Sequence, residues 1–279
     1  MAPELQAAAD RVIDAALAED VGAGDVTSQA VIPADLEFHG VMAAREKMVL
    51  AGLPLVAEVF HRVVPEAKVT FQCADGGTVE AGAVIALLDG PAAGLLTAER
   101  TALNLLQHLS GIATLTRRYA DSIAQSKAVL LDTRKTVPGL RQLAKYATRL
   151  GGAQNHRMGL YDGVLIKDNH IAVCGSVKEA VARAKATTTL PVEVECDRLD
   201  QVADAVEAGA DIILLDNMTT AQLREAVGLI AGRAKTEASG GVTLETISGI
   251  AATGVDYISV GRLTQSAPAV DIGLDWETP

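Results

Sequence analysis

Hydrophobic positions follow two different patterns along this chain. In the first part, short apolar runs separated by Gly and Pro predict strands over residues 38–44, 69–73 and 84–88. A long helix is predicted over residues 98–124, because apolar residues recur there at helical spacing. An amphipathic helix is predicted at the start of the chain as well. The first part therefore mixes helices with short strands.

After residue 127, apolar runs alternate with Ala-rich segments that resemble helices. The predicted strands cover residues 128–131, 164–166, 192–194, 212–215, 234–237 and 257–260. The predicted helices between them include 177–186, 199–208 and 221–230. Apolar strands separated by helices indicate a parallel sheet covered on both faces. The spacing favours a βα barrel, and the chain left after residue 127 is shorter than the roughly 250 residues of a full barrel. We therefore expect an incomplete barrel.

A polar residue or a glycine closes every predicted strand of this second part. These residues are Asp132 with Arg134 and Lys135, then Lys167, Glu195, Asp216, Ser239 with Gly240 and Gly241, and Gly261. The carboxyl ends of barrel strands meet at one face, which carries the active site. A helix cap or a solvated turn would explain any one of these residues, but six positions in register favour a shared site.

Composition and charge narrow the classes of function. The net charge of −11 disfavours general binding to nucleic acid or to an anionic membrane. The sequence contains no uninterrupted apolar stretch of about 18 residues, so no membrane-spanning helix is predicted. The three scattered cysteines lack metal-site or disulfide spacing, which favours a reducing compartment. The start of the chain does not resemble a secretory leader, so we expect a cytoplasmic protein.

Cationic residues gather between positions 133 and 167, where seven Lys or Arg stand against one acid, Asp162. Three of them, spaced four residues apart, predict a solvated helix face: Arg141, Lys145 and Arg149. The others adjoin strand ends or a Gly-rich turn: Arg134, Lys135, Arg157 beside His156, and Lys167. Arginine forks bind carboxylates or phosphates in pairs of hydrogen bonds, and lysine supplies a point charge. This cluster predicts a small polyanionic substrate.

Two carboxylates, Glu195 and Asp216, close neighbouring strands beside this cationic region. They are candidates to hold Mg²⁺ together with phosphate oxygens, to contact sugar hydroxyls, or to stabilise a cationic ribosyl transition state. Glu193 shares the face of Glu195, but Glu195 is preferred because it lies nearer the strand end. The turns at 237–241 and 259–262 contain glycine, which is typical of phosphate sites after late barrel strands. The residues thus indicate a barrel that binds a carboxylated small molecule and a phosphorylated sugar with Mg²⁺.

The chain contains several segments with a distinctive amino-acid sequence. Residues 132–171 read DTRKTVPGLRQLAKYATRLGGAQNHRMGLYDGVLIKDNHI. Others are EDVGAGDVTS (19–28), TAERTALNLLQHLSGIAT (97–114), EVEC (193–196), ILLDNM (213–218), EASGG (237–241) and TGVDYISVGRLTQS (253–266). Together, in order and over nearly the whole chain, they closely resemble the quinolinate phosphoribosyltransferase family.

The resemblance implies an α/β fold with two domains. An N-terminal α/β-sandwich domain spans residues 1–112 and is joined by the tail 268–279, and an open α/β barrel spans 113–267. The implied reaction is a decarboxylating transfer from phosphoribosyl pyrophosphate to quinolinate, which yields nicotinate mononucleotide, pyrophosphate and CO₂ in NAD biosynthesis. The resemblance also implies Mg²⁺ and a homodimer with shared active sites, or a hexamer built from such dimers.

Site roles carry over motif by motif. The residues implied for quinolinate are Arg134, Lys135, His156, Arg157 and Lys167, with Arg100 supplied by the partner subunit. Those implied for phosphoribosyl pyrophosphate are Lys135, Glu195, Asp216, Ser239, Gly240, Gly241 and Gly261. The resemblance makes Lys135, Glu195 and Asp216 catalytic, the two acids holding Mg²⁺ directly or indirectly. The chain departs from the family at Ala153, commonly Gly, and at Gln265, commonly His.

Four other functions fit the sequence less well. A molybdenum-operon paralogue shares the fold, but the intact NHR and KDNH elements disfavour it. A nicotinate phosphoribosyltransferase needs to bind one carboxylate, and five cationic groups exceed that need. A non-catalytic sugar-phosphate sensor would not need both Glu195 and Asp216. A nucleic-acid binder is disfavoured by the acidic charge.

Overall fold

A computed structural model describes residues 2–276 of the chain. Met1, within the predicted first domain, and residues 277–279, within the predicted tail, lie outside the described residues. The chain divides into two compact units: residues 1–117, 136–151 and 264–279 form the first, and residues 118–135 and 152–263 form the second. This division differs from the predicted boundaries, because residues 113–117, 136–151 and 264–267 belong to the first unit. Within residues 2–276, no helix is long and apolar enough to cross a membrane.

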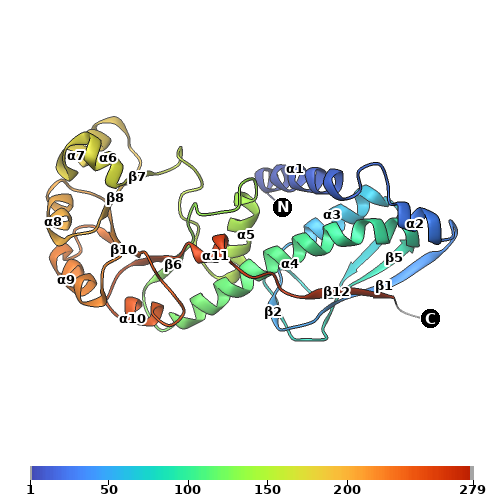
Figure 1. The fold of residues 1–279 in the computed structure, drawn as a ribbon. Helices are drawn as coiled ribbons and strands as arrows, with labels where there is room; N and C mark the ends of the chain where they lie inside the picture. The colour runs from blue at the N-terminus through green and yellow to red at the C-terminus, as the bar shows by residue number, and fades with distance from the viewer. Residues whose placement is uncertain (1, 277–279) are drawn as a thin grey trace. The chain divides into compact units, whose positions relative to one another are not determined.

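The first unit contains a four-stranded antiparallel sheet in the order β12-β1-β5-β3 (Figure 1). Its elements are α1 (Pro3–Asp20), α2 (Val26–Val31), β1 (Glu37–Ala44), β2 (Met48–Val49), α3 (Leu53–Val63), β3 (Lys68–Phe71), β4 (Thr78–Val79), β5 (Val84–Pro91), α5 (Arg141–Gly151), β12 (Ile272–Trp276) and most of α4 (Ala92–Ser122). The short helix α11 (Arg262–Gln265) and the end of α4 span the division between the two units. Although β12 lies near the end of the chain, it pairs with β1 from Gly40–Trp276 to Ala44–Ile272. A continuous apolar core joins the sheet to α1, α3 and α4.

Helix α5 belongs to the first unit although it follows the first barrel strand in sequence. The Tyr146 hydroxyl donates a hydrogen bond to Asp75, whose carboxylate also accepts the backbone N–H groups of Gly52 and Leu53 at the start of α3. The predicted solvated face of this helix is wrong at Lys145, because that side chain is fully buried. Arg141, Lys145 and Arg149 share one face of the helix because they are four residues apart. The helix packs against the first unit, and this packing buries Lys145 in the middle of that face.

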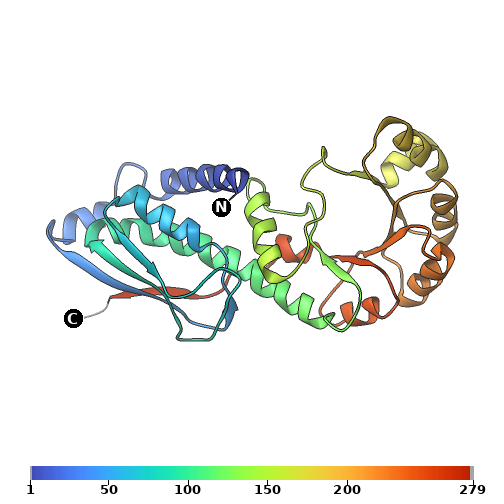
Figure 2. The same cartoon turned by 180° about the vertical axis from the view of Figure 1, so that it is seen from behind.

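The second unit contains a six-stranded parallel sheet in the order β6-β11-β10-β9-β8-β7. Its strands are β6 (Val129–Leu131), β7 (Val164–Ile166), β8 (Val192–Cys196), β9 (Ile212–Asp216), β10 (Lys235–Ser239) and β11 (Tyr257–Ser259). Its helices are α6 (Asp168–Cys174), α7 (Val177–Thr187), α8 (Leu199–Glu207), α9 (Thr220–Ile230) and α10 (Ile247–Ala251). These helices lie in an arc outside the strands (Figures 1 and 2).

The strand order confirms an incomplete βα barrel. Each strand pairs with its successor in sequence from β7 to β11, and β11 pairs with β6. No such pairing joins β6 to β7 within the described residues, so the barrel is open between them. Because all pairs are parallel, the residues that follow β6 to β11 lie at one edge of the sheet, which we call the carboxyl edge.

Candidate active site

The carboxyl edge collects nearly all the predicted site residues. Every one of them except Arg100 lies in the second unit, at the end of a strand or in the segment between β6 and β7. Arg100 is an exposed residue of α4 in the first unit. The convergence expected from six separate strand ends is therefore found within a single unit.

The segment Gln154–Arg157 lies along the open side of β6. Gln154 forms a parallel bridge with Leu131, donating its N–H to the Leu130 carbonyl at 2.8 Å. The buried Asp132 carboxylate accepts the Asn155 side-chain amide at 2.6 Å and the His156 backbone N–H at 2.9 Å. The strand end thus holds the backbone of this segment, and Asp132 is a structural anchor here.

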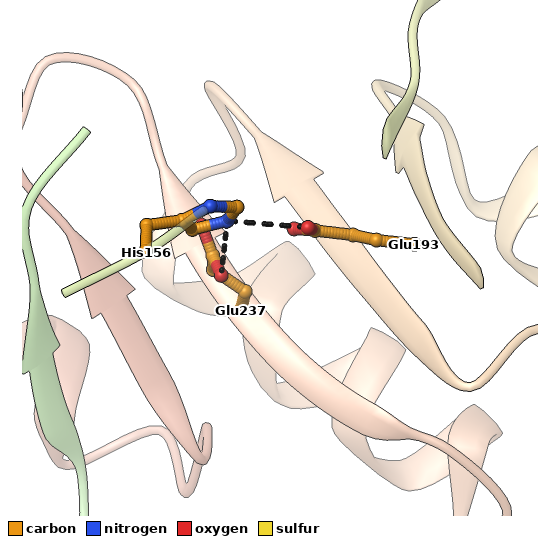
Figure 3. Close-up of side chains that lie close together, drawn as sticks. All are labelled: His156, Glu193 and Glu237. Atoms are coloured by element: carbon orange, nitrogen blue, oxygen red, sulfur yellow. Dashed lines mark ion pairs between the residues drawn. The ribbon is translucent and has the colours of Figure 1, made fainter. Parts of the chain in front are cut away.

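His156 extends from this segment to two buried glutamates on strands β8 and β10 (Figure 3). Its Nε2 lies 3.1 Å from Glu193 Oε2 and 3.5 Å from Glu237 Oε2. The remaining oxygen of each carboxylate, Oε1, is buried and has no hydrogen-bond partner in the described part of the chain. Burial and the neighbouring charge of Glu237 raise the pKa of Glu193.

The hydrogen bonds of the ring select one tautomer of His156. The Arg157 backbone N–H donates to Nδ1 at 2.8 Å, so Nδ1 acts as an acceptor and the ring proton sits on Nε2. Burial lowers the pKa of His156, but the two carboxylates outweigh burial and raise it to about 10. A second proton on Nδ1 would break the hydrogen bond from Arg157, so this hydrogen bond opposes the charged ring that the two carboxylates favour.

The same tautomer argues against a metal ion at this cluster. A metal ion in a protein is commonly held by three or more His, Cys, Asp or Glu side chains. Within residues 2–276, the one group of this kind whose ligand atoms lie within 4.8 Å of one another is His156, Glu193 and Glu237. A histidine that binds a metal through Nε2 normally donates Nδ1–H to a neighbour. Here Nδ1 accepts a hydrogen bond instead. The cluster is better described as a hydrogen-bonded network than as a metal centre.

Two guanidinium groups, Arg134 and Arg157, stand close enough to repel each other. Burial and the charge of Arg134 lower the pKa of Arg157. Arg157 donates to the Gly163 carbonyl at 3.1 Å, whereas Arg134 Nε is buried and lacks a hydrogen-bond partner among the described residues. A buried donor without an acceptor costs free energy, which an anionic ligand at this position would recover.

Lys167 and Glu195, predicted to bind different substrates, form an ion pair with each other. Lys167 follows β7 and Glu195 lies on the neighbouring strand β8. The lysine side chain is 45% exposed, while that of the glutamate is 15% exposed. The cation is therefore the more accessible member of the pair.

Asp216 at the end of β9 is held by its neighbours. Asn217 Nδ2 donates to Asp216 Oδ2 at 2.6 Å, and the Asn217 backbone donates to the Ser239 carbonyl at 2.9 Å. Asn217 adopts a left-handed conformation with φ of 54°, which few non-glycine residues do. It packs against Gly240, where φ is +92° and any Cβ would collide with the Asn217 side chain. Glycine at 240 is thus required by the close approach of these two strand ends.

Gly261 follows the last barrel strand, β11, and lies beside Lys135. A Cβ on Gly261 would lie 2.9 Å from Cδ of Lys135, so the lysine stem crosses directly over this glycine. Ser239 stands opposite Asp216 in the β9–β10 register. The candidate phosphate turns therefore adjoin both a cation and the Asp216 carboxylate.

Comparison with known proteins identifies this arrangement. Residues 25–110 and 112–275 match the two family descriptions "Quinolinate phosphoribosyl transferase, N-terminal domain" and "Quinolinate phosphoribosyl transferase, C-terminal domain". The chain belongs to the quinolinate phosphoribosyltransferase family. A nicotinate-nucleotide pyrophosphorylase (carboxylating) of Mycobacterium leprae is 46% identical over 279 residues, 98% of each chain. A probable enzyme of that name from Bacillus subtilis is 44% identical over 92% of this chain and 89% of its own.

Solved structures of the family share the fold. The nicotinate-nucleotide pyrophosphorylase of Francisella tularensis superposes with a TM-score of 0.93 at 41% identity, covering 97% of this chain and 96% of the other. The fold expected from the resemblance, an N-terminal α/β domain followed by an open barrel, is confirmed by this likeness and by the strand order.

The two departures from the family pattern have simple structural settings. Ala153 is buried, and the positive φ of this turn, +105°, falls on Gly152 instead. Alanine at 153 therefore places no L-residue in a left-handed conformation. Gln265 is an exposed residue at the end of α11.

Sequence reasoning missed the role of Glu193 and Glu237. Alternation along β8 already placed Glu193 on the same face as Glu195, and Glu237 opens the EASGG segment. The preference for strand-end residues favours Glu195 over Glu193, and Glu237 enters only as the first residue of a glycine-containing turn. Acidic residues within otherwise apolar barrel strands were the available signal, because buried carboxylates are rare without a partner.

Proposed function

We propose that this protein catalyses phosphoribosyl transfer from phosphoribosyl pyrophosphate to quinolinate with loss of CO₂. Membership of the family and full-length likeness to nicotinate-nucleotide pyrophosphorylases support this reaction. One observation of the site carries the proposal. A buried, unpartnered Arg134 Nε stands beside Arg157 at the carboxyl edge, and paired guanidinium groups suit a dicarboxylate.

Quinolinate, a dianion, would be held by Arg134, Arg157, Lys135 and Lys167, with Arg100 of the partner subunit completing the pocket. We assign the direct contacts to these cations and not to His156, since both of its ring nitrogens already have partners in the chain. Binding would exchange the Lys167–Glu195 ion pair for contacts to substrate, which frees the carboxylate for the ribose. Holding the pyridine nitrogen against the ribosyl carbon can supply several kcal/mol of barrier lowering.

Phosphoribosyl pyrophosphate would lie along the later strand ends. Ser239, Gly240, Gly241 and Gly261 offer backbone N–H groups and a hydroxyl to the 5′-phosphate, and Lys135 beside Gly261 adds a positive charge. The neighbouring carboxylates Glu195 and Asp216 are hard oxygen donors on adjacent strands, which fits Mg²⁺ bound together with phosphate oxygens. When bound, the ion neutralises the charge of the departing pyrophosphate.

The chemistry needs no proton-transferring base. The ring nitrogen forms a bond to the ribosyl carbon as the bond to pyrophosphate breaks. The adjacent carboxylate then leaves as CO₂, and its electron pair stays on the ring carbon beside the positively charged pyridinium nitrogen, which stabilises it. A proton from water then bonds to this carbon and gives nicotinate mononucleotide. Fixed cations keep the other carboxylate in place, so nicotinate mononucleotide remains bound until release.

We propose a homodimer in which each barrel receives Arg100 of the partner subunit, with a hexamer built from such dimers as the larger form. We further propose that the protein works in the cytoplasm, where its free cysteines stay reduced.

The decisive test is quinolinate-dependent CO₂ release by the purified protein. Release is expected only when quinolinate, phosphoribosyl pyrophosphate and Mg²⁺ are all present. Folded protein that binds phosphoribosyl pyrophosphate but releases no CO₂ would contradict the proposal and point to another carboxylated acceptor.

Asp216→Asn is expected to lower kcat/KM for phosphoribosyl pyrophosphate roughly 100-fold at limiting Mg²⁺, the scale of losing one electrostatic group at a transition state. The Kd for quinolinate should change less than about threefold. Steady-state kinetics over a Mg²⁺ series and calorimetry would measure both.

Asp211→Asn is the matched control, because Asp211 precedes the same strand at its opposite end and accepts the Val192 N–H. That variant should keep the Mg²⁺ dependence of the wild type. An unchanged rate for Asp216→Asn at limiting Mg²⁺ would remove Asp216 from the sugar-phosphate side.

A further inference from the structure

Two buried glutamates, Glu193 and Glu237, have no role in the proposed reaction. They are 4% and 1% exposed, and each leaves one carboxylate oxygen without a hydrogen-bond partner in the described structure. Burying two carboxylates in this way opposes folding unless their charges are compensated. One acceptor would satisfy the His156 Nε2–H, yet two strands each contribute one (Figure 3). The second acid is therefore more than the fold requires.

The network continues from the glutamates to the guanidinium pair. Asp132 fixes the backbone of His156 from β6 but does not fix the rotation of its ring. Glu193 and Glu237 constrain that rotation through Nε2, and Nδ1 in turn accepts the Arg157 N–H at 2.8 Å. His156 thus links strands β8 and β10 to the backbone of Arg157, across the open side of the barrel.

Charge gives Glu193 a second effect on this arginine. Arg134 repels Arg157, and the Glu193 carboxylate attracts it. An exposed acid would offset the repulsion but would also compete with an anionic substrate for the guanidinium groups. Glu193 is buried and held by His156, so it compensates the cations without offering them an alternative partner in the pocket.

We propose that Glu193 and Glu237 are positioning residues which, through the His156 ring, orient Arg157 for one carboxylate of the acceptor substrate. The inference rests on the proposed function, because it takes quinolinate as that acceptor. It assigns the acids to the quinolinate side of the site and gives them no role in binding phosphoribosyl pyrophosphate.

Substitutions at Glu237 separate this role from a purely structural one. Glu237→Leu removes the acceptor and should raise the KM for quinolinate 10- to 100-fold, since displacement of a contact by about 1 Å has effects of that size. The KM for phosphoribosyl pyrophosphate should stay within about threefold. Glu237→Gln retains an acceptor oxygen and should restore the quinolinate KM to within about threefold of the wild type.

A charge-only role predicts a different result for glutamine. Removing a negative charge near the pocket would tighten dianion binding in both variants, whereas positioning weakens it only in leucine. Asp256→Asn is the control, because Asp256 accepts hydrogen bonds from Thr236 near the amino end of the same strand. That variant should lose stability without changing the ratio of the two KM values.

A double-mutant cycle tests whether the glutamate acts through the histidine. The KM for quinolinate of the double variant His156→Leu/Glu237→Leu should equal that of His156→Leu alone. Once the imidazole ring is gone, Glu237 has no ring to position, so its removal has no further effect. Additive losses, or equal losses for both substrates that track the fall in Tm, would overturn the proposal.

A substrate-independent measurement separates this inference from the proposed reaction. ¹⁵N NMR of labelled histidine should show the Nε2–H tautomer for His156 in the wild type and exchange between tautomers in Glu237→Leu. An unchanged ring signal in Glu237→Leu overturns the positioning role. Failure of the wild type to bind quinolinate would contradict the proposed function, while the ring signal would still decide whether the glutamates hold His156.

Discussion

Arg134→Ala should raise the KM for quinolinate about 10²- to 10³-fold and leave the Kd for phosphoribosyl pyrophosphate within about threefold of the wild type. Truncating one partner of a buried, charge-assisted contact costs roughly 2–5 kcal/mol, and 1.4 kcal/mol corresponds to a factor of ten. Arg134 Nε is a buried donor without a hydrogen-bond partner in the described chain, so the substitution breaks no hydrogen bond at this atom. The loss should therefore appear in substrate binding and not in folding.

Kinetics with each substrate varied in turn, together with thermal unfolding, would measure this separation. Arg134→Lys keeps the charge but loses the planar fork, and we expect it to fall between alanine and the wild type. Arg149→Ala is the control for net charge, because Arg149 is exposed on α5 and has no assigned role. Equal weakening of both substrates by Arg134→Ala would refute the assignment.

Mixing two inactive variants should restore activity if subunits share their sites. Arg100→Ala and Lys167→Ala are each expected to abolish most turnover, since both remove a cation from the proposed quinolinate pocket. A heterodimer of the two contains one site with both defects and one site with neither. Random exchange makes half of the dimers mixed, so about a quarter of wild-type activity should return.

A second mixture shows whether the rescue depends on shared sites. Lys167→Ala and Asp216→Asn both fall on the carboxyl edge of the same unit, so every site of their heterodimer keeps one defect. That mixture should recover nothing. Absence of rescue in the first mixture, with heterodimers verified by native mass spectrometry, would remove Arg100 of the partner subunit from the site.

Both the barrel and its chemistry could be predicted from local patterns. The predicted strand 164–166 coincides with β7, and the predicted strand 192–194 covers the first three of the five residues of β8. Apolar residues mark such strands because parallel sheets are buried on both faces. Strand-end residues such as Asp216 could be grouped without any contact information, since parallel strands bring their carboxyl ends to one edge. The DTRKT, NHR and KDNH segments then narrowed the reaction to one family.

Other features depend on contacts that no local pattern encodes. Lys145 lies on a helical stripe with Arg141 and Arg149, yet it is buried because α5 packs into the first unit. The pairing of Lys167 with Glu195 joins residues that the family motifs assign to different substrates. Each outcome follows from which elements become neighbours, and long-range packing sets those neighbours.

The residue types and their order were enough to predict an open barrel, because secondary-structure periodicity and strand-end geometry are local rules, and the strand order confirms it. The cationic edge and the phosphate turn follow from the same local rules and stay predictions. Which charged groups pair with one another depends on the tertiary structure, which brings strands β8 and β10 to His156. A buried carboxylate must satisfy whichever donor the fold places beside it, and for Glu193 and Glu237 that donor comes from a segment dozens of residues away in the chain.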